Sequence, residues 1–110
     1  MTGNEYQQLA SRTINRELTT YEKRQHALFG MASEVGELLG LYQKGYQGHE
    51  LIEEHEQKEI GDILWMVAEY CTTQGWELDD IMALNIEKLR ARFPDGFDPE
   101  KSLHRKEGDV

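Results

Sequence analysis

Apolar side chains recur every three or four residues along most of the chain, and no stretch alternates steadily between apolar and polar residues. The first pattern is typical of amphipathic helices, whereas steady alternation would indicate strands. It predicts four helices, over about residues 4–17, 20–44, 50–74 and 79–93. Because the connections between them are short, we expect an all-α domain that resembles a four-helix bundle.

Local signals support these boundaries. Thr19 and Glu22 have the spacing of a capping box, in which each side chain accepts a hydrogen bond from the other residue's backbone N–H. Asp79 is a candidate N-cap for the last helix. The end of the chain is rich in turn-forming and charged residues. We therefore expect a helical domain over residues 1–97 and an extended charged tail over residues 98–110.

Two pairs of carboxylates fall on the apolar faces of the second and third predicted helices. On a helical wheel with about 100° per residue, Glu34 lies inside the apolar arc of the second helix and Glu37 lies at its edge. Glu59 and Asp62 occupy the same two places on the third helix. The arcs themselves contain Ala27, Leu28, Met31, Val35, Leu38, Leu39, Leu41 and Tyr42, and Ile52, Ile60, Ile63, Leu64, Met66, Val67, Tyr70 and Cys71.

Burying unpaired carboxylates costs several kcal/mol, and four together also repel one another. Neither arc has a basic residue at a central position, so a divalent cation such as Mg²⁺ or Mn²⁺ is the partner that fits best. Solvated acids at the ends of the bundle, or acids paired with cations of the tail, are the alternative. Glu56 also lies in the apolar arc and is a candidate for an additional ligand or a general base, unless it faces water. The helices contain no Glu-x-x-His pair, and His and Cys show no zinc spacing.

The fourth predicted helix carries complementary charge. Asn85, Lys88 and Arg92 share one face, where an amide and two cations could hold phosphate oxygens that project from the metal. The alternative is an ordinary amphipathic edge, with cations placed near the negative end of the helix dipole.

Composition limits the classes of partner. The net charge of −9 argues against a nucleic-acid polymer, although a single nucleotide held through a metal stays compatible with it. No apolar run approaches the length that a membrane span needs, and the first residues do not resemble a secretion signal. The single cysteine, Cys71, favours a reducing compartment. We therefore expect a cytoplasmic protein with no membrane partner.

The second predicted helix also has a second face that favours association. Phe29, Ser33, Gly36 and Gly40 lie opposite the main apolar arc, and small residues at this spacing allow close helix packing. One chain of this size cannot cover both faces. We expect a homodimer or a homotetramer, with sites near subunit interfaces.

Two segments carry a family resemblance. SEVGELLGLYQK and KEIGDILWMVAEYC together give the pattern E-x-x-E…E-x-x-D, with 21 residues between the inner acids, and NIEKLRARFPDGF follows them. In these segments the chain resembles the MazG-type nucleotide pyrophosphohydrolases, part of the all-α NTP pyrophosphatase superfamily. The resemblance extends over roughly residues 21–106.

The resemblance implies that Mg²⁺, which Mn²⁺ could replace, is bound by Glu34, Glu37, Glu59 and Asp62 and that these acids are catalytic. Metal ions of this kind neutralise phosphate charge and activate water. One of the carboxylates, Glu34 or Glu37, would orient or deprotonate that water.

The resemblance further implies hydrolysis of a nucleoside triphosphate between its α- and β-phosphates, which releases a monophosphate and pyrophosphate. Asn85, Lys88 and Arg92 would bind the substrate, and the purpose would be cleansing of the nucleotide pool. Two other interpretations remain open. One is a metal-stabilised helical interaction module without catalysis, and the other is an enzyme related to phosphoribosyl-ATP pyrophosphohydrolase.

Overall fold

The computed structural model describes residues 1–110, and all of its regular elements are helices. The elements are α1 (Gly3–Ser11), α2 (Thr20–Gly45), α3 (Glu53–Gln74), α4 (Leu78–Arg92) and α5 (Pro99–Leu103). The prediction of an all-α fold is confirmed. No helix is both long enough and apolar enough to cross a lipid bilayer.

The start of α2 is fixed by the predicted capping box. The Thr19 hydroxyl accepts a hydrogen bond from the Glu22 N–H at 3.1 Å, and the Thr19 N–H donates to Glu22 Oε1 at 2.9 Å. The two N–H groups would otherwise lack partners, because the first turn of a helix has none within the helix.

The start of α4 differs from the prediction. Glu77, not Asp79, is the N-cap residue, and it makes no side-chain capping bond. Asp79 lies in the first turn, where its N–H donates to Asn4 Oδ1 at 2.9 Å while the Asn4 N–H donates to Asp79 Oδ1 at 3.1 Å. The prediction of an Asp79 cap was wrong because this carboxylate joins α4 to the start of α1, a contact between residues far apart in the chain.

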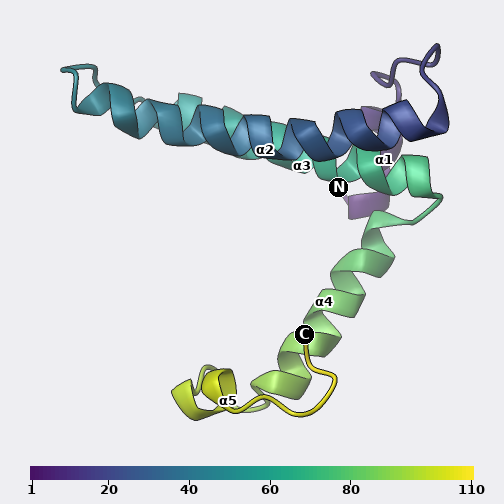
Figure 1. The fold of residues 1–110 in the computed structure, drawn as a ribbon, viewed down its shortest axis with the longest axis vertical. Coiled ribbons are helices and arrows are strands. Elements are labelled where there is room, and N and C mark those ends of the chain that lie inside the picture. The colour runs from purple at the N-terminus through teal and green to yellow at the C-terminus, as the bar shows by residue number, and fades with distance from the viewer.

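Helices α2 and α3 lie side by side and form a long antiparallel hairpin, called the α2–α3 hairpin below (Figure 1). The side chain of Met66 on α3 packs against the backbone of α2 at Gly30, where an added Cβ would lie 2.1 Å from Met66 Sδ. Met66 is 3% exposed, and Ala27, Ala68 and Cys71 are also buried around this crossing. The small buried core therefore lies near the N-terminal half of α2.

Helix α1 covers one side of this core and holds the start of α4. Gln7 makes the main link, since its Nε2 donates to the Trp76 carbonyl at 2.8 Å and its Oε1 accepts from the Leu78 N–H at 2.7 Å. The Trp65 indole N–H donates to Thr13 Oγ1 at 2.8 Å. This hydrogen bond joins α3 to the turn that follows α1.

Beyond its first turn, α4 leaves the α2–α3 hairpin at a wide angle (Figure 1). The radius of gyration is 17.2 Å, against about 13 Å for a compact domain of this length. The accessible surface is 8499 Å², against about 6,300 Å² for a folded monomer of this mass. A single chain therefore leaves surface uncovered that folded domains normally bury.

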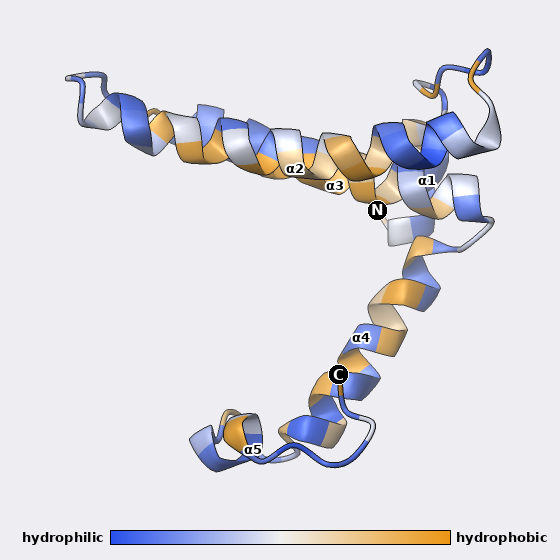
Figure 2. Ribbon diagram, viewed as in Figure 1, coloured by the Kyte–Doolittle hydropathy of each residue, from blue (hydrophilic) through white to orange (hydrophobic).

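Much of this uncovered surface is apolar. Hydrophobic segments follow the edge of the α2–α3 hairpin that faces the open angle toward α4 (Figure 2). The exposed apolar side chains include Leu28, Val35, Leu39, Ile60 and Leu64 on the hairpin and Met82, Leu84, Ile86 and Leu89 on α4. Seven of the sixteen residues that the wheel assigned to a core are exposed in one chain, and only Ala27, Met66 and Cys71 are buried.

Residues 98–110 are not extended throughout. Asp98 caps the short helix α5, its side chain accepting from the Glu100 N–H at 3.0 Å, and Pro99 occupies the first helical position. Near the end of the chain, Asp109 forms an ion pair with Arg92 of α4. The charged tail differs from our expectation because Asp98 caps a helix and Asp109 turns back onto α4.

One buried acid lies outside the predicted carboxylate pairs. Glu69 on α3 is 5% exposed, and both of its oxygens lie within hydrogen-bond distance of His26 Nδ1 on α2, at 3.0 and 3.1 Å. No other hydrogen bond reaches this carboxylate, so His26 alone compensates for its burial.

We expect His26→Ala to lower the free energy of unfolding by about 1–3 kcal/mol, because it leaves the buried Glu69 carboxylate without a partner. Urea unfolding measures the change. The double variant His26→Ala/Glu69→Gln should regain part of the loss, since a neutral amide is cheaper to bury. His55→Ala, at an exposed position, is the control. A double variant no more stable than His26→Ala would contradict this account.

Candidate metal centre

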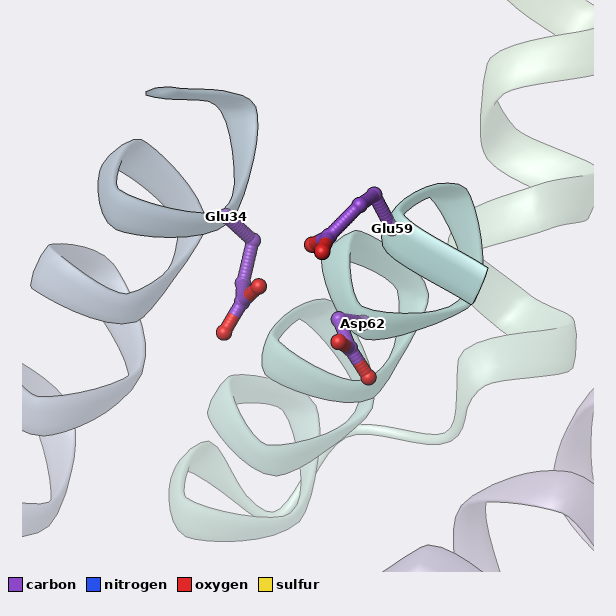
Figure 3. A group of neighbouring side chains, drawn as sticks. All are labelled: Glu34, Glu59 and Asp62. Atoms are coloured by element: carbon purple, nitrogen blue, oxygen red, sulfur yellow. The ribbon is translucent and has the colours of Figure 1, made fainter. Parts of the chain in front are cut away.

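Three of the predicted carboxylates converge between α2 and α3. Glu34 on α2 points across the hairpin toward Glu59 and Asp62 on α3 (Figure 3). One oxygen from each lies within 4.8 Å of the others, and all three residues are half-buried. The i, i+3 spacing of Glu59 and Asp62 brings both side chains to the same face of α3.

The oxygens in this cluster are short of partners. Glu34 Oε2 and Glu59 Oε2 are buried and make no hydrogen bond. Burial raises the pKa of Glu34, and the neighbouring charges of Glu37 and Asp62, together with Glu59, raise it further. No basic side chain forms an ion pair with any of these acids.

A divalent cation fits this arrangement. Carboxylate oxygens are the hard ligands that Mg²⁺ and Mn²⁺ prefer, and a cation would supply the partner that the two buried oxygens lack. The groups that would hold it are the carboxylates of Glu34, Glu59 and Asp62.

Glu37 and Glu56 each lie one helical turn from an acid of the cluster. Glu37 lies one turn after Glu34 on α2 and is exposed, and its oxygens are not among the three that converge. Its charge still raises the pKa of Glu34, so it lies within electrostatic range. Glu56 has a partner of its own, because the Tyr42 hydroxyl donates a hydrogen bond to Glu56 Oε1.

Two tyrosines interact with this part of the hairpin, and the sequence patterns did not predict either contact. Tyr6 on α1 has its hydroxyl 3.5 Å from the Gly61 carbonyl, and burial together with the charge of Asp62 raises its pKa. Tyr42 on α2 holds Glu56. Tyr42 was counted in the apolar arc, and Tyr6 lies about 55 residues away in sequence from its contact, so neither spacing nor periodicity identifies these roles.

The predicted substrate-binding residues lie elsewhere. Asn85, Lys88 and Arg92 belong to the part of α4 that projects away from the α2–α3 hairpin (Figure 1). Asn85 and Lys88 are exposed, and Arg92 pairs with Asp109. Within one chain, α4 packs against α1 and does not bring these residues over the carboxylates.

The raised pKa of Glu34 predicts a pH dependence for the metal-free protein. A carboxyl with a raised pKa in the folded state contributes stability at acid pH, and that contribution is lost as pH rises through the raised pKa. In EDTA, we expect stability relative to Glu34→Gln to fall as the pH rises from 4.5, the usual pKa of a glutamate, toward alkaline values. Thermal unfolding of both proteins across this range measures it. Parallel stability curves would contradict the prediction.

Comparison with known protein families gives one match. Residues 22–97 match the model of the MazG nucleotide pyrophosphohydrolase domain. The matched span contains all of the convergent acids and nearly all of α2, α3 and α4. No curated protein and no solved structure gives a significant match. Because the match spans well over half of its residues, the chain belongs to the MazG nucleotide pyrophosphohydrolase domain family.

Proposed function

We propose that the protein is a Mg²⁺-dependent pyrophosphohydrolase that converts a nucleoside triphosphate, ribo or deoxy, into the monophosphate and pyrophosphate. The observation that carries the proposal is the convergence of Glu34, Glu59 and Asp62, with two buried oxygens that have no partner. The family match supports the nucleotide substrate. Cleansing of the nucleotide pool is the role we propose for it.

In this proposal Glu34, Glu59 and Asp62 would hold the ion, and Glu37, one turn after Glu34 on α2, would be the fourth ligand. Mg²⁺ supplies charge neutralisation for the phosphates and acidifies bound water, and Mn²⁺ can substitute for it. Glu34, Glu37 and Glu56 are the candidates for orienting or deprotonating the attacking water, since Glu37 follows Glu34 by one turn of α2 and Glu56 precedes Glu59 by one turn of α3.

We propose that the site is completed by a second copy of the chain. The apolar edge of the α2–α3 hairpin and that of α4 are both exposed, and the total surface exceeds that of a typical folded monomer by about 2,200 Å². In a homodimer, or a tetramer built from it, α4 of one copy would cover the hairpin of the other. We propose that Asn85, Lys88 and Arg92 of one copy then lie next to the carboxylates of the other.

We also propose a cytoplasmic location. Cys71 is the only cysteine and is a buried free thiol, which is compatible with a reducing compartment.

The proposed activity is tested with all eight common NTPs and dNTPs, with and without Mg²⁺, and with identification of the products. Release of pyrophosphate and a monophosphate from at least one nucleotide, only with the cation, supports the proposal. Metal-independent release, or orthophosphate as the product, would contradict it. Binding of Mg²⁺ with no hydrolysis of any nucleotide would favour the non-catalytic interaction module. Turnover of phosphoribosyl-ATP alone would favour the related enzyme of that specificity.

A further inference from the structure

A cavity of about 460 Å³ lies between the end of α4 and the last residues of the chain. Lys88 and Arg92 line it from α4, and Lys101, His104 and Lys106 line it from the segment that follows. Glu107 and Asp109 are its acidic lining residues. In a protein with a net charge of −9, this is a local concentration of positive charge.

The most buried cation of this cavity is held by one carboxylate. Arg92 Nε lies 2.9 Å from Asp109 Oδ2, and Arg92 Nη2 lies 2.8 Å from Asp109 Oδ1. The two side chains are 11% and 16% exposed. This two-point geometry is the one with which guanidinium groups bind carboxylates and phosphates alike.

A tight turn brings Asp109 to this position. The Asp109 N–H donates to the Lys106 carbonyl at 3.0 Å, and Gly108 between them has a φ of 84°. Glycine reaches this left-handed conformation without the steric cost that a Cβ would add. Hydrogen bonds from Arg92 lower the pKa of Asp109, burial opposes this, and the charges of Arg92, Arg105 and Lys88 lower it further. The carboxylate therefore lies in a strongly cationic surrounding.

We propose that this cavity is a binding site for a phosphate-bearing anion and that Asp109 occupies it as an internal competitor. The anion would take the place of the Asp109 carboxylate on Arg92, with Lys88, Lys101 and Lys106 balancing its further charge. The inference rests on the proposed function in one respect, because Lys88 and Arg92 are also its substrate-binding residues. It adds Asp109 as a competitor and a contribution from Lys101, His104 and Lys106, which lie outside the region that matches the family. It needs neither the metal nor turnover.

The test is binding of inorganic pyrophosphate to the full chain in EDTA at low ionic strength, by calorimetry. We expect weak binding to the wild type and roughly tenfold tighter binding to Asp109→Asn, because a neutral amide binds Arg92 more weakly than a carboxylate does. In the Asp109→Asn background, Lys101→Gln/Lys106→Gln should remove most of this gain. Asp95→Asn makes the same charge change at an exposed position outside the cavity and is the matched control.

Two results would overturn the proposal. One is an Asp109→Asn protein that binds pyrophosphate no more tightly than the wild type, and the other is an equal gain in Asp95→Asn, which would indicate a general charge effect. A dNTP and its phosphate-free nucleoside distinguish the sources of the anion. A dNTP that binds Asp109→Asn more tightly than pyrophosphate does identifies a nucleotide site, and an equal or lower affinity identifies a site for the free anion. Binding of the nucleoside alone would contradict both. Since no metal is present, failure here removes Asp109 as a competitor without affecting the metal-dependent hydrolysis assay, and failure of hydrolysis leaves this binding result standing.

Discussion

Glu34→Gln is expected to lower Mg²⁺-dependent hydrolysis by roughly 10²- to 10³-fold while leaving the fold intact. The substitution keeps the shape of the side chain and removes the charge of one of the three convergent acids. Asp62→Asn should have a similar effect from the opposite helix. Steady-state release of pyrophosphate from the preferred nucleotide measures both variants.

The same substitution separates loss of the metal from loss of the fold. In EDTA at neutral pH, Glu34→Gln should be at least as stable as the wild type, because it relieves a buried carboxylate that lacks a partner. Mg²⁺ should raise the melting temperature of the wild type and have little effect on Glu34→Gln. Glu17→Gln, an exposed acid far from the cluster in sequence, is the control. A Glu34→Gln protein with full activity would refute the assignment of the metal site.

The second large effect tests which copy of the chain supplies the basic side chains of α4 to each site. If α4 of one copy serves the carboxylates of the other, Glu34→Gln and Lys88→Ala should each be nearly inactive alone and should complement each other when mixed. After unfolding and refolding an equal mixture, about half of the dimers are mixed and each contains one intact site of two, so about a quarter of wild-type activity should return. The measurement is pyrophosphate release before and after mixing.

A second mixture tests whether the recovery requires one variant with intact carboxylates and one with an intact α4. Glu34→Gln mixed with Asp62→Asn should stay inactive, because every site then has one defective set of carboxylates. Mixed dimers are detected by native mass spectrometry in both cases. If mixed dimers of Glu34→Gln and Lys88→Ala form without any recovery, Lys88 does not act across the interface as proposed.

Features that depend on neighbouring residues were well predicted from the sequence. The capping box of Thr19 and Glu22 formed as expected, since it needs only residues three apart. Placing Glu34, Glu59 and Asp62 on apolar arcs predicted their approach, because the i, i+3 spacing and the length of the turn between α2 and α3 determine which faces meet. The family segments pointed to the same acids.

Features that depend on distant partners were not predictable in this way. Asp79 has the composition of an N-cap, and its actual partner, Asn4, is 75 residues away. The pairing of Arg92 with Asp109 depends on how the last residues turn back. The direction of α4 could not be predicted either. An amphipathic pattern shows that a helix has an apolar face, but it does not show whether that face packs on the same chain or on a second copy.

The order in which the fold forms follows from the position of the carboxylates. Glu34, Glu59 and Asp62 belong to consecutive helices joined by a short turn, so closing one small loop is enough to bring them together. We therefore expect their mutual repulsion to act early, before the association with a second copy that we propose. We expect Mg²⁺ to increase the rate of refolding as well as the final stability, because the ion removes a barrier that arises before association.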